Sequence, residues 1–395
     1  MNKLKTWADS NLQGDRVIWV VVFLLSMISV LVVYSSIGTL AFKRSVSPEK
    51  YLITHTLHII IGIAAMWFAH RVDYRYYSKL SRVALWVSVP LLIYTFTNGT
   101  TINDAARWIQ VPIIGSFQPS DFASLALIVN LASMLSKRQQ NINDFADSLF
   151  PILFWCGIIC GLIALTNMST AILLLMTCMI IMFIGRVPVK YLAMLFFVGI
   201  LFGALAFKFG VRGGTVANRV TDFIENVKGE KELPFQAKHA HIAIATGGIT
   251  GKGPGNSDQR NILPHPYSDF IYAIVIEEYG MIGGVLVLVL YLVLLHRGMK
   301  VAYNSERAFA GLLSAGLSFD IVCQAMINMG VVVGLGPITG QPLPLISMGG
   351  TSMVFTGLSI GIILSVSRGE KDEAWTQRVK MSPEKENKMV EAEAA

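Results

Sequence analysis

The sequence predicts an all-α integral membrane protein with ten transmembrane helices, and three observations support this prediction. Of the 395 residues, 53% are apolar and only 14% are charged, whereas about 25% of residues are charged in an ordinary soluble domain. The apolar residues form ten separate runs, and a bilayer core requires about 20 such residues per helix. Basic residues gather in alternate connections between the runs. The net charge of +7 is dispersed over a membrane protein, which argues against a nucleic-acid-binding protein.

Each predicted span is a continuous apolar run, which excludes the alternating strands of an outer-membrane barrel. A helix satisfies its own backbone hydrogen bonds, as lipid requires. The runs are Val17–Phe42, Leu52–Ala69, Val83–Thr97, Phe122–Leu135, Leu149–Thr166, Thr170–Gly185, Val189–Phe209, Phe270–Leu295, Phe309–Gly334 and Leu345–Val366.

The distribution of Lys and Arg predicts the orientation. One side, which includes both ends of the chain, carries twenty basic residues, and the short loops of the other side carry four. Because Lys and Arg mark the cytoplasmic side, we expect residues 1–16 and the tail 367–395 to be cytoplasmic, with one membrane domain over residues 17–366. The first run is too long for the apolar region of a signal peptide, so we expect no cleavage.

The four cysteines lie inside predicted helices, on three different spans, and form neither a zinc-site pattern nor a disulfide framework. We expect them to be packing residues. They are Cys156, Cys160, Cys178 and Cys323.

One outer loop is exceptional, because Gly210–Asp269 contains 60 residues whereas most other connections are short. Such a long loop is usually either functional or disordered. Within it, Val216–Val227 predicts an amphipathic helix, and Ala240–Ile249 is apolar enough to lie at the membrane interface. A glycine-dense turn follows around Lys252, but it lacks the first Gly and the Ser or Thr of a nucleotide-binding P-loop. Either an anion-binding backbone or a plain turn accounts for these glycines.

Carboxylates cluster where this loop re-enters the membrane. By position alone, Asp269 is a helix N-cap, because a carboxylate there accepts backbone hydrogen bonds and interacts well with the helix dipole. Glu277 and Glu278 follow about 12–13 Å deeper at 1.5 Å per residue. Intramembrane carboxylates normally face the bundle interior with a partner. Spacing does not decide between a chemical role and helix packing.

The ninth run carries a polar stripe at four-residue spacing, formed by Asp320, Gln324 and Asn328. Such stripes commonly hydrogen-bond one helix to another. We favour this interpretation over the alternative, in which the stripe lines a substrate path.

Three dispersed groups of residues, in this order along the chain, resemble the shape, elongation, division and sporulation (SEDS) family over nearly all of Val17–Val366. They are Arg107–Ile109 with Phe117–Asp121; Gly247–Ser257 with Ser268–Ile271 and Glu277–Gly280; and Pro337–Pro344 with Ser347–Ser352. The stretch Gly255–Gln259 is more similar to the division type (FtsW-like) than to the elongation type (RodA-like). Tyr267 stands where many members have His, so the resemblance supports no mechanism that requires that His.

The resemblance implies a peptidoglycan glycosyltransferase that polymerises lipid II on the outer face of the bacterial cytoplasmic membrane. The partners would be a class B penicillin-binding transpeptidase and other division proteins, with no nucleic acid, and the place would be the division septum. The essential aspartate of the family matches Asp269, which replaces the capping interpretation with a general base. Substrate-binding roles would fall to Arg107, Lys252, Gln118, Gln259 and Ser268, with Glu277, Glu278, Asp320, Gln324 and Asn328 as intramembrane polar support.

Two alternatives remain beside this function: a lipid II flippase and a non-enzymatic division scaffold. The chemistry also requires the pyrophosphate charge to be neutralised, either by Arg107 and Lys252 or by a divalent cation such as magnesium or manganese. No cofactor is required by the residues themselves, and the sequence identifies no metal site. An apolar groove open to the bilayer is expected for the lipid tail.

Overall fold

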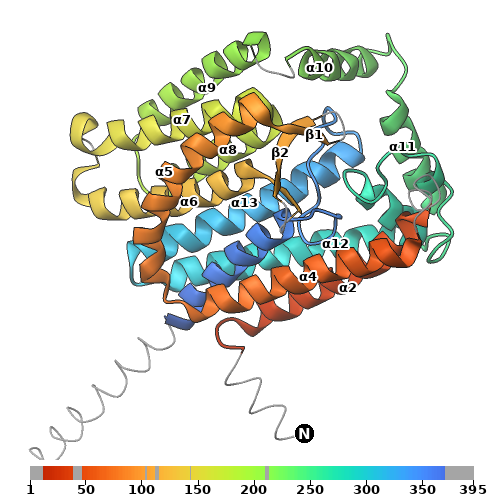
Figure 1. Ribbon diagram of the computed structural model, residues 1–395, viewed down its shortest axis with the longest axis horizontal. Helices are drawn as coiled ribbons and strands as arrows, with labels where there is room; N and C mark the ends of the chain where they lie inside the picture. Colours follow the sequence, from red (N-terminus) through yellow and green to blue (C-terminus); the bar gives the residue numbers. More distant parts are fainter. Residues whose placement is uncertain are drawn as a thin grey trace, which may run out of the picture.

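A computed structural model describes residues 12–38, 47–102, 105–111, 115–142, 144–209 and 213–369. The chain forms a helical bundle in which most elements run roughly parallel or antiparallel to one another (Figure 1). Its helices are α2 (Arg16–Ser36), α4 (Pro48–Arg71), α5 (Tyr74–Asn98), α6 (Pro119–Arg138), α7 (Phe150–Thr166), α8 (Met168–Ile184), α9 (Val189–Phe209), α10 (Gly213–Val227), α11 (Phe235–Gly247), α12 (Ile271–Asn304), α13 (Ala308–Val332) and a final helix, Ser352–Gly369.

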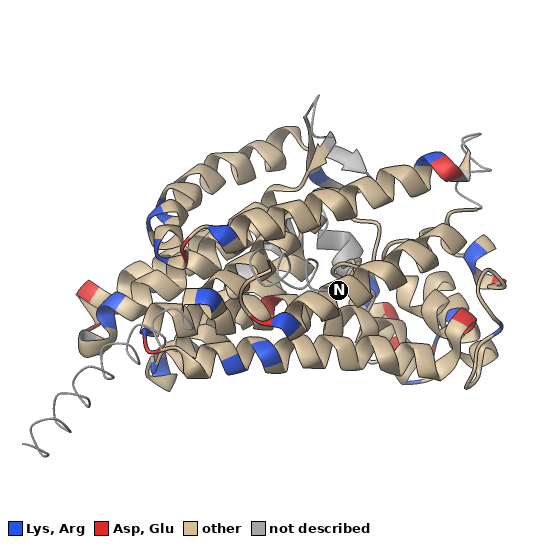
Figure 2. Ribbon diagram, turned by 90° about the horizontal axis from the view of Figure 1, so that it is seen from below, with Lys and Arg blue, Asp and Glu red and all other residues tan. Residues whose placement is uncertain are grey.

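Each of the ten predicted apolar runs overlaps a helix of the structure. Eight helices in the described part of the chain are long and apolar enough to cross a membrane, whereas α8 and the segment Val189–Leu201 of α9 are shorter apolar helices. The all-α membrane fold is therefore confirmed, and the exact number of ten spans stays a prediction. Figure 2 shows long stretches of helix without a charged residue.

The predicted ends of several runs differ from the helix ends in the structure or lie outside the described residues. The first run was expected to continue to Phe42, but α2 ends at Ser36, and residues 39–46 lie outside the described part of the chain. The last run was expected to begin at Leu345, but its helix begins only at Ser352. Leu345 has a φ of 64° and Gly350 a φ of 45°, and neither conformation continues a right-handed helix.

The centre of the bundle consists of α12 and α13, which pack on each other. α2 and α4 lie on one side of this pair, and α6, α7, α8 and α9 on the other (Figure 1). α13 also packs against α6 and α8, and α6 is among the most buried of the long helices. The buried thiols Cys156, Cys160 and Cys178 form no disulfide, which confirms the packing prediction for these three.

A small antiparallel sheet, which the apolar pattern did not predict, replaces the second outer loop. Its strands are β1 (Thr100–Ile102), β2 (Ala105–Val111) and β3 (Gly115–Phe117), in the order β1-β2-β3. In the β2–β3 pair, Ile109 is opposite Phe117. β3 leads directly into α6, so the sheet fixes Arg107 on β2 above the start of that helix.

The helix α12 is broken at Gly280, which has a φ of 70°. The glycine-dense turn of the long loop supplies hydrogen bonds to the groups that the break exposes. Lys252 N–H donates to the Glu277 carbonyl, and Met281 N–H donates to the Gly248 carbonyl, both at 2.9 Å. This explains the glycines without an anion, because a Cβ on Gly251 would lie 2.2 Å from the Glu278 carbonyl oxygen. Ala240–Ile249 accordingly contributes α11, which packs on α12.

Candidate functional site

Asp269 lies at the end of the long loop, two residues before α12. The residue at the N-cap position of α12 is Phe270, and no side chain caps this helix. The positional interpretation of Asp269 as an N-cap is therefore wrong. Its half-buried carboxylate instead accepts a hydrogen bond from the Ser268 hydroxyl at 2.9 Å, which leaves carboxylate lone pairs for other partners.

The backbone around Asp269 is held by α13 and by the segment after it. Asn328 donates through Nδ2 to the carbonyls of Asp269, at 2.8 Å, and of Gln341, at 2.7 Å. The Ser347 hydroxyl donates to the Ser268 carbonyl at 2.6 Å. These bonds join two groups of residues that the sequence analysis singled out, around Asp269 and around Gly340, and they fix the carboxylate at one place on the bundle.

Two arginines lie close to Asp269 in the space beside Gly340. A Cβ placed on Gly340 would lie 3.4 Å from Asp269 Oδ2, 3.7 Å from an Arg107 terminal nitrogen and 3.8 Å from an Arg219 terminal nitrogen. Gly340 has a φ of 66°, a conformation that glycine adopts readily. One carboxylate and two guanidinium groups therefore converge on a single point that is kept clear of side chains.

Arg219 is the member of this group that the sequence analysis missed. It lies on α10, the amphipathic helix that Val216–Val227 predicted, and it donates to the Ile338 carbonyl at 3.1 Å. Burial lowers the pKa of Arg219, and the nearby charge of Asp269 acts in the opposite direction. The amphipathic pattern predicted the helix, but nothing in the pattern indicated which of its residues faces Asp269.

Arg107 reaches the site from β2, as described above, and is also close enough to Asp121 for the two charges to interact. Gln118, expected among the substrate-binding residues, donates through Nε2 to Asp121 Oδ1 at 2.8 Å and to the Ser120 hydroxyl at 2.9 Å. Gln118 is buried. Its described contacts therefore organise the start of α6 and do not include Asp269.

Lys252 and Gln259 belong to a different cluster, centred on Glu277. Lys252 Nζ lies 2.8 Å from Glu277 Oε1 and 2.8 Å from Asp258 Oδ2. This pairing raises the pKa of Lys252 and lowers that of Asp258. Gln259 donates its N–H to Glu277 at 3.3 Å, and its side-chain oxygen lies 2.7 Å from His239 Nδ1.

The predicted intramembrane support is therefore divided among several places. Glu277 holds the glycine-dense turn, and Glu278 accepts a hydrogen bond from the Ser35 hydroxyl of α2. On the stripe of α13, Asn328 holds Asp269 and Gln324 donates to the Pro342 carbonyl at 3.3 Å. Both bonds run to non-helical chain, whereas Asp320 interacts with Thr177 of the neighbouring helix α8, as we expected of the stripe. Asp320 faces a separate cavity.

The residues around Asp269 do not fit a protein-held divalent cation. Magnesium and manganese prefer several oxygen ligands, whereas Asp269 is a single carboxylate beside two guanidinium groups. The described residues contain no group of three His, Cys, Asp or Glu side chains arranged to hold a metal. The positive charge at this site is supplied by arginine.

Comparisons with known proteins identify the family of the chain. Residues 15–372 match the model of a family described as cell cycle protein, FtsW/RodA/SpoVE. The chain is 31% identical over 360 residues to the probable peptidoglycan glycosyltransferase FtsW of Geobacter sp. strain M18, which covers 89% of this chain and 96% of that protein. It is 32% identical over 362 residues to the stage V sporulation protein E of Bacillus subtilis strain 168, which covers 90% and 97%.

The fold has a solved counterpart. A chain from a structure described as a peptidoglycan synthase complex that coordinates polymerization and crosslinking superimposes with a TM-score of 0.69. The two chains are 23% identical, and the match covers 90% of this chain and 98% of the other. At this identity the similarity establishes the fold alone.

Proposed function

The chain belongs to the FtsW/RodA/SpoVE family of multi-pass membrane proteins, and we propose that it is a peptidoglycan glycosyltransferase that polymerises lipid II on the outer face of the cytoplasmic membrane. The convergence of Asp269, Arg107 and Arg219 on one open point beside Gly340 is the observation that carries this proposal. Such a site offers a base together with two cations, which are the groups that glycosyl transfer from a pyrophosphate requires.

The reaction joins two lipid II molecules. The 4-hydroxyl oxygen of one N-acetylglucosamine forms a bond to the anomeric carbon of the other molecule's N-acetylmuramic acid. The bond from that carbon to the polyprenyl pyrophosphate breaks, and the pyrophosphate leaves with the electron pair. Asp269 takes the hydroxyl proton, and general base catalysis of this kind contributes about 10²–10⁴ in rate.

The leaving group needs its charge stabilised more than it needs a proton. Arg107 and Arg219 supply two guanidinium groups, which bind phosphate oxygens through paired, charge-assisted hydrogen bonds. They come from different elements, β2 and α10. No step of this mechanism passes through a metal ion held by the protein.

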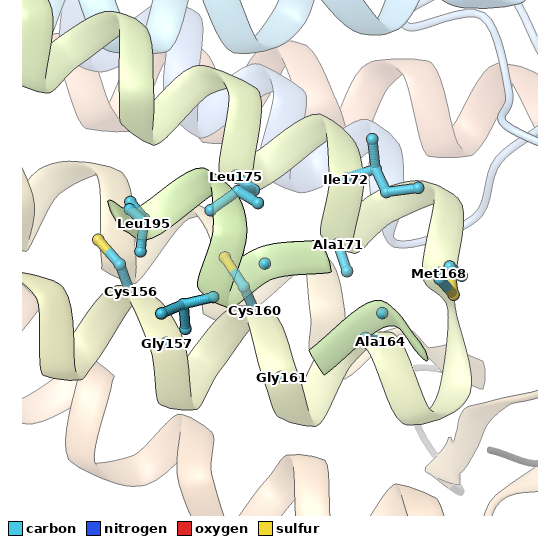
Figure 3. A pocket seen from close by; sticks show the side chains of 13 residues that line it. Cys156, Gly157, Cys160, Gly161, Ala164, Met168, Ala171, Ile172, Leu175 and Leu195 are labelled. Carbon is cyan, nitrogen blue, oxygen red and sulfur yellow. The ribbon is translucent and has the colours of Figure 1, made fainter. Parts of the chain in front are cut away.

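An apolar pocket of about 40 Å³ suits one short segment of the lipid tail. It lies between α7, α8 and α9 and is lined by Cys156, Cys160, Leu175, Leu195 and several glycines, with no charged residue (Figure 3). Its wall includes Ala171, next to Thr170, whose hydroxyl accepts a hydrogen bond from Gln341 at 2.8 Å. Gln341 adjoins Gly340, so the pocket connects through one short chain of contacts to the point where the arginines meet Asp269.

The proposed cellular setting follows from the family and the charge distribution. We infer a class B penicillin-binding transpeptidase as partner, because polymerised strands must be crosslinked and a structural counterpart comes from a complex that does both. We also infer the division septum as the place of action, since several similar proteins carry the name FtsW.

The test is lipid II polymerisation by purified protein with and without the transpeptidase. Asp269→Asn keeps the shape of the side chain and removes the base, so we expect folded protein that still binds the transpeptidase and makes no glycan strands. Asp258→Asn is the matched control, because Asp258 is an exposed carboxylate of the same loop, and it should keep its activity.

Three results would contradict the proposal in distinguishable ways. Near-normal polymerisation by Asp269→Asn would remove the general base. Transport of labelled lipid II into liposomes, with no polymer formed by the wild type, would indicate a flippase. Growth of cells that carry only Asp269→Ala would indicate a scaffold.

A further inference from the structure

A second polar site lies inside the bundle, apart from the proposed reaction centre. It is a cavity of about 50 Å³ between α6, α8, α13 and the final helix. Oxygen-bearing side chains form much of its wall, and no Lys, Arg or His is among the residues that line it. The residues that carry the argument are Asp121, Ser124, Thr170, Asp320, Gln324 and Gln341.

The cavity is rich in acceptors because two carboxylates, several hydroxyls and two amide oxygens lie in its wall. Gln324 donates through Nε2 to the Pro342 carbonyl, and Gln341 donates through Nε2 to the Thr170 hydroxyl. Each glutamine therefore keeps its amide oxygen and one further N–H for the cavity. Ser124 is 8% exposed, and its Oγ has no hydrogen-bond partner in the described part of the chain. A buried hydroxyl without a partner is costly unless a ligand completes its coordination.

The charges near the cavity do not balance. Asp121 lies in the first turn of α6, where the helix dipole stabilises it, and the charge of Arg107 is close by. Asp320 lies in the middle of α13, where the helix dipole does not stabilise it, and it faces the Thr177 hydroxyl of α8 instead of a cation. Arg107 provides one positive charge beside Asp121, and no Lys, Arg or His lines the cavity beside Asp320. One negative charge is left over inside the bundle, where an unpaired carboxylate is expensive.

We propose that this cavity binds one monovalent cation, sodium, between Asp121 and Asp320. Carboxylate, hydroxyl and amide oxygens are the ligands that hard cations take. One positive charge neutralises the cluster, whereas a divalent ion would overcompensate it. The cavity has room for one ion and at most a few water molecules. This suits a small cation that has lost most of its hydration shell.

The cation would also steady the proposed reaction centre. Gln341, on the wall of the cavity, adjoins Gly340, which lies over Asp269. Asp121, on the opposite wall, interacts with Arg107. With sodium bound between the two aspartates, Asp121 draws Arg107 less strongly away from the substrate side.

The test is thermal unfolding of the purified full-length protein in sodium chloride, potassium chloride and choline chloride at equal ionic strength. We expect a saturable rise of the unfolding temperature with sodium and little rise with the other two salts. Sodium-22 retention by the wild type should saturate at one ion per chain. These readouts do not depend on polymerisation, so they stand or fall separately from the proposed function.

Variants make the assignment specific. Asp320→Asn should abolish the sodium response, and the milder Ser124→Ala should lower the apparent sodium affinity about tenfold, since affinity follows ligand number and charge. Glu232→Gln removes an exposed carboxylate and should leave the response intact. Equal unfolding temperatures in sodium and choline, with stabilisation of the wild type on acidification instead, would show a shared proton and overturn the proposal. Equal stabilisation by potassium would overturn the choice of sodium.

Discussion

At the scale of single residues, Gly340 combines two requirements in one position. Its φ of 66° disfavours any side chain, and a Cβ there would occupy the space between Asp269 Oδ2 and the two guanidinium groups. We expect Gly340→Ala to fold, at a cost of roughly 1 kcal/mol for the left-handed conformation, and to lose about tenfold in polymerisation rate because the substrate is displaced.

The matched control for this prediction is Gly229→Ala. Gly229 has a φ of 77°, and nothing lies within 4 Å of a Cβ built on it. It therefore carries the same backbone strain without a crowded site, and its activity should equal that of the wild type. Equal losses in both variants would mean that strain, and not occupation of the site, lowers the rate.

Substitution of Arg219 distinguishes a role in catalysis from a role in folding. Arg219→Ala removes one of the two cations at the proposed leaving-group position, and we expect the rate at saturating lipid II to fall about 100-fold, the usual cost of one charge-stabilising group. Lys228→Ala changes an exposed residue just after the same helix and should have no effect. A rate for Arg219→Ala within twofold of the wild type, at unchanged unfolding temperature, would leave Arg107 as the only cation in the mechanism.

At the scale of elements, the broken helix α12 explains the glycine-dense turn. A break at Gly280 exposes backbone groups that membrane surroundings leave without water, and the turn returns hydrogen bonds to Glu277, Glu278, Met281 and Ile282. Glycine is required both in the turn and at the break of α12, since a Cβ on Gly280 would lie 2.1 Å from the Ile249 carbonyl oxygen. The turn and the broken helix therefore form one structural unit.

Lys252 tests whether this unit is structural. The Glu277 side chain is fully buried, and Lys252 is its cationic partner. Lys252→Met leaves that carboxylate without a counter-charge, so we expect the unfolding temperature to fall by roughly 5 °C, with KM for lipid II changed less than about twofold.

Lys238→Met is the control for this change, because Lys238 pairs with a glutamate that is 87% exposed, and such surface pairs contribute little stability. A raised KM for Lys252→Met at an unchanged unfolding temperature would restore Lys252 to substrate binding, as the family resemblance implied.

At the scale of the whole molecule, the sequence predicted those features that each segment determines locally. Apolar runs predicted the helices, and the amphipathic pattern predicted α10. What it did not predict depends on contacts between distant segments. Arg219 meets Asp269 only after α10 folds over the bundle, and Lys252 meets Glu277 only because α12 breaks at Gly280. No local sequence pattern indicates either contact, and the family resemblance alone singled out Asp269.

The start of α2 and the end of the final helix lie at the same end of the described bundle. Asp15 caps α2 and pairs with Arg297 in the second half of α12, at 2.5 Å. Arg368, at the end of the final helix, donates to the carbonyl of Arg71, the last residue of α4. The even number of crossings that the sequence predicts would place the start of α2 and the end of the final helix on one side of the membrane, in agreement with these contacts.

This arrangement predicts which residues are accessible from each side. Val227 lies at the end of α10 in the long outer loop and is 70% exposed, and Tyr303 lies near the end of α12 and is 90% exposed. In cells with permeable outer layers, a membrane-impermeant maleimide should label Val227→Cys directly and Tyr303→Cys only after the cytoplasmic membrane is opened. The wild type is the control, since Cys156, Cys160 and Cys178 are buried and Cys323 is only partly accessible. Labelling of Tyr303→Cys in intact membranes would reverse the orientation and place Asp269 on the cytoplasmic side, away from the outer face where strand synthesis is proposed.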